Sequence, residues 1–305
     1  MPFSLRALAY IVAAGDAKSV SQAAKALSVS QPAISGVIAE AEERLGTQLF
    51  VRHHARGVTP TVAGLHFIHE ARLLINHAKD FEKTVGALGS SIAGEITVGC
   101  FVTLATRYMP RLLAEFSRKL PGITVRLEEG NQQEIIDGLL SGRMEIALAY
   151  AYSLPKEIGG TCLTELPPYL LVAADHALAK RKTISLKEIS NEPFILLDLP
   201  HSRDYFMSLF IACGTSPLIV YRAQSYELIR GLVGHGHGYT IHNALPGTSV
   251  TYDGSRVTAR PITESVLPVQ VMSLHLRNQT MRPAVKAFAD FLSTVFSQAL
   301  DPPPR

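Results

Sequence analysis

The first sixty residues carry apolar side chains at helical spacing, in short runs separated by turn residues. Leu5, Leu8 and Ile11 lie three residues apart and outline a first helix that ends near residue 15. Ser19 or Ser21 can cap a second helix, because a serine hydroxyl accepts a hydrogen bond from the free amides of a first turn. The pattern therefore predicts short helices in close succession.

A third helix is predicted after a tight turn at residues 28–30. Ser30 can cap it, and Pro32 is tolerated because first-turn amides have no intrahelical partner. Gly46 ends it. Its inward stripe is predicted to consist of Ile34, Ile38, Ala41 and Leu45. Two helices joined by a short turn, the second polar on its outer face, predict a helix-turn-helix.

A small hairpin and a long helix are expected next. Residues 48–52 and 57–59 can pair as a wing, and residues 60–88 contain no internal proline after Pro60, which allows a helix of about 43 Å. The apolar stripe of this helix consists of Val62, Leu65, Ile68, Ile75, Ala78, Phe81, Val85 and Leu88. A small domain cannot cover so long a stripe, so the helix predicts a homodimer.

The pattern changes after a linker at residues 89–94. Predicted strands at 95–99, 123–128, 146–150, 169–174, 194–197, 218–222, 239–241 and 269–276 alternate with predicted helices. The helices contain 109–116, 131–140, 205–212, 226–233 and 283–296. Such alternation predicts α/β structure with a parallel sheet and crossover helices.

Composition and charge narrow the class of protein only slightly. The 305 residues are 47% hydrophobic and 18% charged, as in a globular protein of about two domains. No long apolar run or signal peptide is visible, which predicts a cytoplasmic protein with no membrane partner. Residues 1–60 hold six Lys/Arg and four Asp/Glu, a weak basic bias. The three cysteines have no metal-like spacing, so reduced thiols are expected, with a redox role of Cys100 left open.

Several segments resemble the LysR family of bacterial transcriptional regulators. Residues 23–35, AAKALSVSQPAIS, resemble the family's helix-turn-helix, and residues 42–46, 49–52 and 59–61 continue the likeness at the family's spacing. Residues 129–131, 139–147 and 231–238 resemble its effector domain more weakly. The recognition helix departs from the family pattern: Gly36, Val37, Ala39 and Glu40 stand where basic and amide residues are usual, so fewer phosphate and base contacts are expected from this helix.

The resemblance implies a fold and a division of the chain. An α-rich winged helix-turn-helix would span residues 1–59, a dimerisation helix 60–88 and a hinge 89–94. A two-lobed α/β effector domain like periplasmic binding proteins would span 95–300, with lobe one at about 95–163 and 268–300 and lobe two at about 166–265. The protein would be a DNA-binding regulator and not an enzyme, without cofactor or metal. Its partners would be double-stranded operator DNA, a small effector and further copies of the chain up to a tetramer, with RNA polymerase as another candidate.

DNA contacts are expected from the start of the recognition helix and from the wing. Gln31 and Ser35 lie one turn apart, and Gln can pair with adenine while Ser can bond to several bases. Arg52 and Arg56 on the wing would contact phosphates. The alternative is an ordinary solvated surface. The candidate residues are Ser30, Gln31, Pro32, Ala33, Ser35, Arg52, His53 and Arg56.

The effector is expected where strands end and helices begin, between the lobes. The candidates are Cys100, Phe101, Thr103, Asn131, Tyr150, Tyr152, Pro200, His201, Ser202, Arg203 and His242. The resemblance places Thr103 and Asn131 at effector-binding positions, although both can instead cap helices. The loop 200–203 suggests an anionic group, and the tyrosines an aromatic one. A carboxylate-bearing, aromatic effector is therefore the hypothesis.

Two other classes of protein are weighed against this one. No nucleophile elbow, phosphate-binding loop or zinc-protease motif is present, which disfavours an enzyme. Metal sites at His235/His237 or His66/His69 are disfavoured by a glycine-rich turn and by the helical spacing, respectively. A solute-binding protein would account for residues 94–300 but not for the leading ninety.

Overall fold

The structure is a computed structural model that describes residues 3–53, 57–86, 92–245, 247–277 and 279–298. It begins with α1 (Leu5–Ala17), α2 (Val20–Ala26) and α3 (Gln31–Leu45). The hydroxyls of Ser4, Ser19 and Ser30 accept amide hydrogen bonds at the three helix starts, which confirms Ser30 as a cap and selects Ser19 over Ser21. Gly46 ends α3 in the left-handed conformation. Ile34, Ile38 and Ala41 are buried, whereas Leu45 is 44% exposed, so Leu45 was wrongly placed in the inward stripe.

The predicted wing is an antiparallel hairpin of β1 (Phe50–His53) and β2 (Gly57–Pro60). Three contacts fix its orientation on the helices. Glu42 on α3 accepts hydrogen bonds from the amides of Leu49 and Phe50 at 2.8 and 3.0 Å. The amide of Val58 donates to the carbonyl of Lys18 at 3.0 Å. Gly57 has φ +88°, and a Cβ there would overlap that same carbonyl, so the wing needs glycine at this position.

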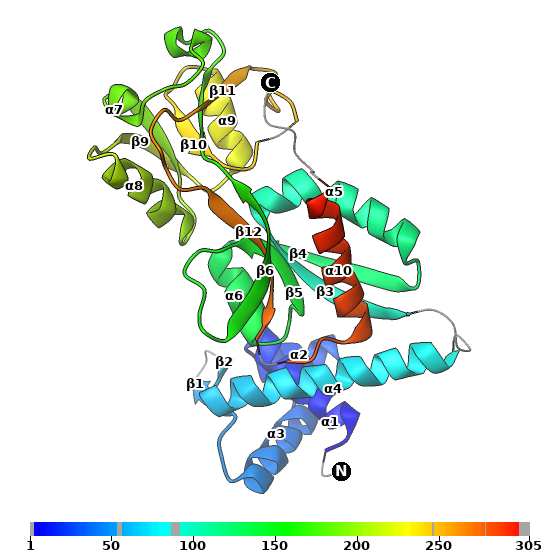
Figure 1. Cartoon of the computed structure of the whole chain (residues 1–305). Coiled ribbons are helices and arrows are strands. Elements are labelled where there is room, and N and C mark those ends of the chain that lie inside the picture. Colours follow the sequence, from blue (N-terminus) through cyan, green and yellow to red (C-terminus); the bar gives the residue numbers. More distant parts are fainter. Residues whose placement is uncertain (1–2, 54–56, 87–91, 246, 278, 299–305) are drawn as a thin grey trace.

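The long helix α4 (Val62–Gly86) lies between the DNA-binding helices and the rest of the chain (Figure 1). It packs mainly against α1. Ile68 is buried there, while Val62 and Phe81 are 87% and 69% exposed. The predicted stripe is thus divided between intramolecular packing and an uncovered surface. The side chain of Val85 and all of Leu88, which the prediction included, lie outside the described residues.

The first lobe is built on a five-stranded sheet in the order β4-β3-β5-β12-β6. The strands are β3 (Gly94–Phe101), β4 (Ile123–Gly130), β5 (Ile146–Tyr150), β6 (Ile158–Leu166) and β12 (Val269–Leu276), and the helices are α5 (Val102–Lys119), α6 (Gln132–Leu140) and α10 (Pro283–Ser297). β3 is parallel to β4 and β5, as predicted. β12 is antiparallel to β5 and β6, so the prediction of a parallel sheet was wrong for this edge.

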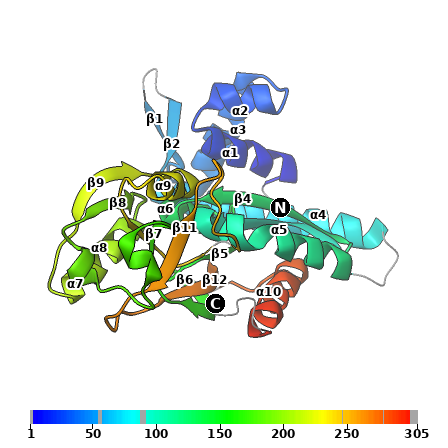
Figure 2. The same cartoon turned by 90° about the horizontal axis from the view of Figure 1, so that it is seen from above.

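The second lobe contains two smaller sheets. β8 (Pro193–Leu197) and β9 (Leu218–Ala223) are parallel, whereas β7 (Tyr169–Ala173) lies antiparallel between β10 (Thr240–His242) and β11 (Val257–Pro261). The helices are η1 (Ala177–Lys180), α7 (Leu186–Ile189), α8 (Ser202–Ala212) and α9 (Tyr226–Gly234). β6 and β11 were not predicted as strands. Seen from above, the DNA-binding helices and the hairpin project together from one side of the lobes (Figure 2).

Buried polar contacts join α4 to the first lobe. The Arg282 guanidinium, 2% exposed, binds both carboxylate oxygens of Glu145 at 2.8 and 2.7 Å and also pairs with Asp80 on α4. It donates further to the carbonyl of Glu95 at 2.9 Å. His69 on α4 adds to this contact through a hydrogen bond with Gln279, which lies between β12 and α10. Among the described helices, none is long and apolar enough to cross a membrane.

Replacing Arg282 with methionine is expected to destabilise the protein by about 3–5 kcal/mol, because the buried carboxylate of Glu145 and the partly buried carboxylate of Asp80 would lose their cation. The measurement is urea unfolding of the full chain followed by circular dichroism. Lys286→Met is the matched control, since Lys286 pairs with Asp290 at 2.8 Å on the exposed face of α10. The control should change stability by less than about 1 kcal/mol. Equal effects of the two variants would contradict the importance of the buried contact.

Candidate functional site

The start of α3 is an uncovered polar surface. Ser30, Gln31, Pro32 and Ala33 are exposed, and Ser35 is partly exposed on the next turn. The hydroxyl of Ser30 accepts a hydrogen bond from the amide of Ala33 at 3.3 Å, so this side chain caps the helix. Behind the surface, Ile34 and Ile38 are buried in the core of α1–α3. The start of α3 therefore exposes short polar and small side chains, while the buried Ile34 and Ile38 fix the helix on the core.

The wing is held at the C-terminal part of α3, where Glu42 accepts the amides of Leu49 and Phe50, and it carries basic side chains. Arg52 and His53 are exposed on β1. Arg56, the other predicted phosphate contact, lies outside the described residues, as does His54. Farther along α3, Arg44 pairs with Glu40 at 2.6 Å. Beyond Ser35, α3 carries Glu40, Glu42 and Glu43 against Arg44 alone, so cationic contacts to DNA must come from outside this part of the helix, with the wing as one source.

A small cavity lies between the two lobes. Phe101, Thr103, Tyr150 and Tyr152 line it from the first lobe, and Leu197, Ser202, Phe206, Tyr226, His242, Asn243 and Ala244 line it from the second. Its free space is about 10 Å³, roughly the room that one water molecule needs. The lobes are thus closed on each other, and any larger ligand must part them.

The walls of the cavity are aromatic. The rings of Phe101 and Tyr150 are 5.0 Å apart, and those of Tyr150 and Tyr152 are 5.1 Å apart. Tyr150 hydrogen-bonds to Thr103 through the two hydroxyls at 3.1 Å. Burial raises the pKa of Tyr150, Tyr152 and Tyr226, so the phenols are neutral at physiological pH. Such walls favour an apolar, planar ligand.

His242 is the buried titratable group of the cavity. Its ring is 4.3 Å from that of Tyr226, and its Nε2 has no hydrogen-bond partner among the described residues. Burial lowers the pKa of His242 to about 3, and the nearby Arg230 adds to the shift. The imidazole is therefore neutral at pH 7. Asn243, the next residue, donates to the carbonyl of Leu166 at 3.0 Å and to the hydroxyl of Tyr205 at 2.9 Å, beside the crossing between lobes.

Five predicted effector residues do not line this cavity. Cys100 is buried in β3, and Pro200 and Arg203 are exposed, with Arg203 paired to Asp198 at 2.8 Å. Asn131 accepts hydrogen bonds from the amides of Gln133 and Glu134 in a capping box, so it holds the start of α6. His201 is 3.2 Å from Gln133 of the other lobe, outside the cavity. For Asn131 the structure shows the capping role that the sequence left as the alternative.

Six predicted residues do line the cavity, and five lining residues were missed. The six are Phe101, Thr103, Tyr150, Tyr152, Ser202 and His242, and the five are Leu197, Phe206, Tyr226, Asn243 and Ala244. Tyr226 could have been found, because it follows the cap Ser225 at the start of α9, where ligands often bind. Leu197 and Phe206 look like ordinary core residues in the sequence and give no such indication.

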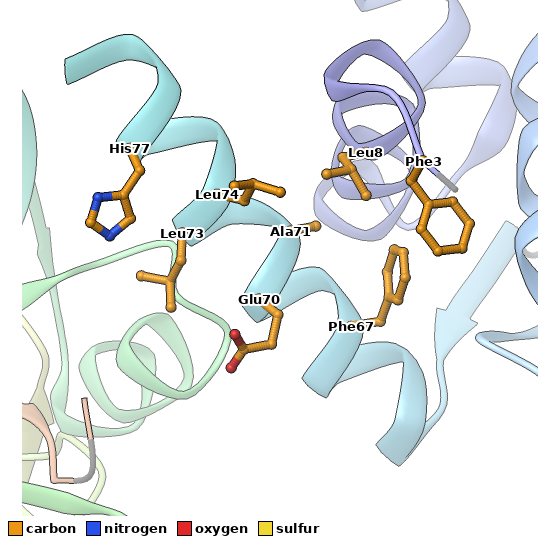
Figure 3. Close-up of a pocket in the computed structure, with 8 residues that line it drawn as sticks. All are labelled: Phe3, Leu8, Phe67, Glu70, Ala71, Leu73, Leu74 and His77. Carbon is orange, nitrogen blue, oxygen red and sulfur yellow. The ribbon is translucent and has the colours of Figure 1, made fainter. Parts of the chain in front are cut away.

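A second, larger groove lies between α1 and α4, with a volume of about 550 Å³ (Figure 3). Its lining is mostly apolar: Phe3, Leu8, Phe67, Ala71, Leu73 and Leu74, with Glu70 and His77. The rings of Phe3 and Phe67 meet edge to face, 5.5 Å apart. Leu74 is 39% exposed in the groove. The uncovered part of α4 is therefore continuous with an apolar hollow on the DNA-binding part.

A winged helix-turn-helix, a long connecting helix and a two-lobed α/β domain with a closed cavity define a transcriptional regulator controlled by a small molecule. Residues 5–65 match the family described as "Bacterial regulatory helix-turn-helix protein, lysR family", and residues 89–297 match the "LysR substrate binding domain". The chain belongs to the LysR family of DNA-binding transcriptional regulators.

Solved structures and curated relatives agree with this assignment. A putative LysR family regulator from Pseudomonas aeruginosa is 34% identical, with a TM-score of 0.66 over 97% of this chain and 99% of that one. The regulator HinK from the same organism is also 34% identical, with a TM-score of 0.65 over 96% and 99%. The hydrogen peroxide-inducible genes activator of Pectobacterium carotovorum is 27% identical over 83% of each chain.

The neutral state of His242 makes stability depend on pH. In the unfolded chain this histidine has a pKa near 6.5, so lowering the pH protonates the unfolded state first and weakens folding from about pH 6.5 down toward pH 3. Between pH 7 and pH 5 this residue should remove about 2 kcal/mol of unfolding free energy. Urea unfolding at both pH values measures the effect.

The matched variants are His242→Gln and His237→Gln. His242→Gln should reduce the pH dependence, whereas His237→Gln, at an exposed histidine of the same lobe, should retain it. Identical pH dependence in the wild type and in His242→Gln would show that His242 does not stay neutral on folding.

Proposed function

We propose that this protein binds operator DNA through α3 and the β1–β2 wing and changes its binding when a small effector occupies the cavity between the lobes. The observation that supports the proposal is the capped and exposed start of α3 in a domain that also carries the basic wing and that α4 connects to the first lobe of the closed cavity. The proposed division of the chain is residues 1–59 for DNA, 60–88 for dimerisation, 89–94 for the hinge and 95–300 for the effector. The protein would act in the cytosol, where its DNA is.

The two parts of the DNA surface would do different work. Gln31 and Ser35 would reach base edges in the major groove, and Pro32 and Ala33 would offer apolar contact to thymine methyls. Arg52, His53 and Arg56 would lie along phosphates and add affinity without reading sequence. Because α3 beyond Ser35 carries Glu40, Glu42 and Glu43 against Arg44 alone, the salt dependence would come from cations outside this part of the helix, those of the wing among them.

Gln31→Ala and Arg52→Ala should therefore weaken DNA binding in distinguishable ways. The measurement is a gel shift with DNA from upstream of the protein's own gene, with non-specific competitor and a salt series. Gln31→Ala should cost about 1–3 kcal/mol on the specific site only, whereas Arg52→Ala should weaken all DNA and lower the salt slope by about one. Lys286→Met, on the exposed face of α10, is the control and should bind normally. If neither DNA-binding variant differs from the wild type, α3 and the wing are not the DNA surface.

The groove between α1 and α4 would be covered by α4 of a second copy. Its apolar lining and the exposed Phe81 at 69% form a continuous uncovered surface. LysR regulators form oligomers, and two such dimers would give the tetramer that the sequence suggested. RNA polymerase would be contacted by the DNA-bound assembly.

Leu74→Glu should shift the protein toward the monomer, because a buried carboxylate without a cation is costly in an apolar interface. The measurement is sedimentation velocity over a concentration series. Leu45→Glu introduces the same charge at a leucine of similar exposure, 44% against 39%, on α3 outside the groove. This control should leave the oligomer intact. A Leu74→Glu protein of unchanged mass in solution would rule out dimerisation through this groove.

Peroxide sensing, which the name of the Pectobacterium relative indicates for that protein, finds little support in this chain. Cys100, Cys162 and Cys213 are free. Burial raises the pKa of the Cys100 and Cys213 thiols, which disfavours the reactive thiolate. The exposed Cys162 lies on β6, outside the cavity lining. A bound effector therefore accounts for the chemistry of the cavity better than a thiol switch.

A further inference from the structure

We infer that the effector is a small uncharged aromatic compound with a hydroxyl group, held between the lobes with that hydroxyl on Nε2 of His242. The inference rests on the proposed function and names the chemical class of its effector. It replaces the sequence-based expectation of a carboxylate.

The hydrogen-bonding requirement comes from His242. Its residue is 2% exposed and lines the cavity, and its Nε2 is buried without a hydrogen-bond partner among the described residues. A buried polar atom left unpaired costs about 1–3 kcal/mol. A neutral imidazole presents either a donor or an acceptor at Nε2, depending on its tautomer. A hydroxyl group satisfies both cases, because it donates and accepts.

The shape requirement comes from the rings around this nitrogen. Phe101, Tyr150 and Tyr152 form a run of ring contacts at 5.0 and 5.1 Å on one lobe. Tyr226 lies against the imidazole on the other lobe, at 4.3 Å between ring centroids. A flat aromatic ring inserted between these groups would bury its faces against aromatic walls. Even one ring exceeds the free space of about 10 Å³ in the closed cavity, so its insertion must part the lobes.

The charge requirement comes from the lining as a whole. No lining residue in the described part of the chain is an acid, a lysine or an arginine. Four arginines lie within four residues of a lining residue in the chain, and each has another partner. Arg203 and Arg222 pair with Asp198. Arg107 donates to the carbonyl of Leu245. Arg230 donates to Glu227 and to the carbonyls of Thr248 and Val250. A carboxylate in this cavity would lose its hydration without gaining a cation, at a cost of several kcal/mol.

The start of α8 is the feature that most favours an anionic ligand. It does not outweigh the hydrogen-bonding, shape and charge requirements described above. Ser202 at this helix start lines the cavity, and helix starts attract negative charge. Asp204 in the same first turn already supplies negative charge, and Arg203 and Arg222 are paired with Asp198. The remaining partial positive charge suits a hydroxyl or carbonyl oxygen of a neutral ligand.

Isothermal titration of the full chain with phenol, benzamide and benzoate tests the inference. Benzamide and benzoate have the same shape and differ in charge, so their comparison isolates the charge requirement. Phenol and benzamide should bind, and benzoate should bind at least about tenfold more weakly, which corresponds to about 1.4 kcal/mol. Benzene, which lacks the polar group, should also bind more weakly than phenol.

Variants locate the binding site. His242→Leu should weaken phenol binding by about tenfold or more, whereas His237→Leu, at an exposed histidine outside the cavity, should not. Tyr226→Ala removes the ring that lies against the imidazole and provides a second cavity variant if His242→Leu fails to fold. It should also weaken phenol binding, and an unchanged affinity would contradict the placement of the ligand at His242.

Three outcomes overturn the inference: no binding of phenol at millimolar concentration, tighter binding of benzoate than benzamide, or unchanged phenol affinity in His242→Leu. The same preparation is tested by gel shift. If specific DNA binding is retained with any of these outcomes, only the proposed effector class is wrong. If the wild type shows no specific DNA binding, the proposed function itself is wrong.

Discussion

The Arg282 guanidinium is the buried charge on which the arrangement of the whole chain depends. It links α4 through Asp80, the sheet of the first lobe through Glu145 and the carbonyl of Glu95, and α10, which begins directly after it. A buried guanidinium with carboxylates on two elements has few alternative arrangements, because separating any partner leaves an unpaired charge in the interior. The helix that leads to the DNA-binding part is therefore held in a defined position on the first lobe.

This attachment gives a physical route from cavity to DNA. The second lobe touches the first across the cavity, and the bond between Asn243 and the carbonyl of Leu166 lies at the crossing between them. A ligand that parts the lobes changes the position of the second lobe relative to the first, to which α4 is fixed. In an oligomer, such a change alters how neighbouring copies fit and hence the spacing of their DNA-binding parts. The effector can shift this equilibrium only as far as its affinities for the two arrangements differ.

Much of the fold could be predicted because its determinants are local. Ser30, Pro32 and Gly46 mark the recognition helix, and β5 and β12 begin and end at the predicted residues. The antiparallel direction of β12 depends on where a distant segment returns to the sheet, and no local pattern encodes that. β11 is only partly buried and lacks clear alternation, so it was missed.

About half of the residues that line the cavity could be predicted from the sequence, again because some of the determinants are local and others are not. Residues at strand ends of one lobe, such as Thr103 and Tyr150, follow from the rule that ligands bind there. Asn131 fits the same rule, yet its side chain is used to cap α6. Phe206 and Asn243 face the cavity only because the two lobes pack against each other, and no local sequence pattern indicates that packing.

The central claim is that this chain binds DNA as a symmetric assembly whose contacts change with the effector. DNase footprinting of the full chain on DNA upstream of its own gene, with and without phenol, tests it most directly. The account predicts two protected half-sites, separated by about one or more turns of about 10.5 base pairs, whose protection or spacing changes when phenol is added. A complete absence of protected sequence at moderate salt, from folded oligomeric protein, would contradict it.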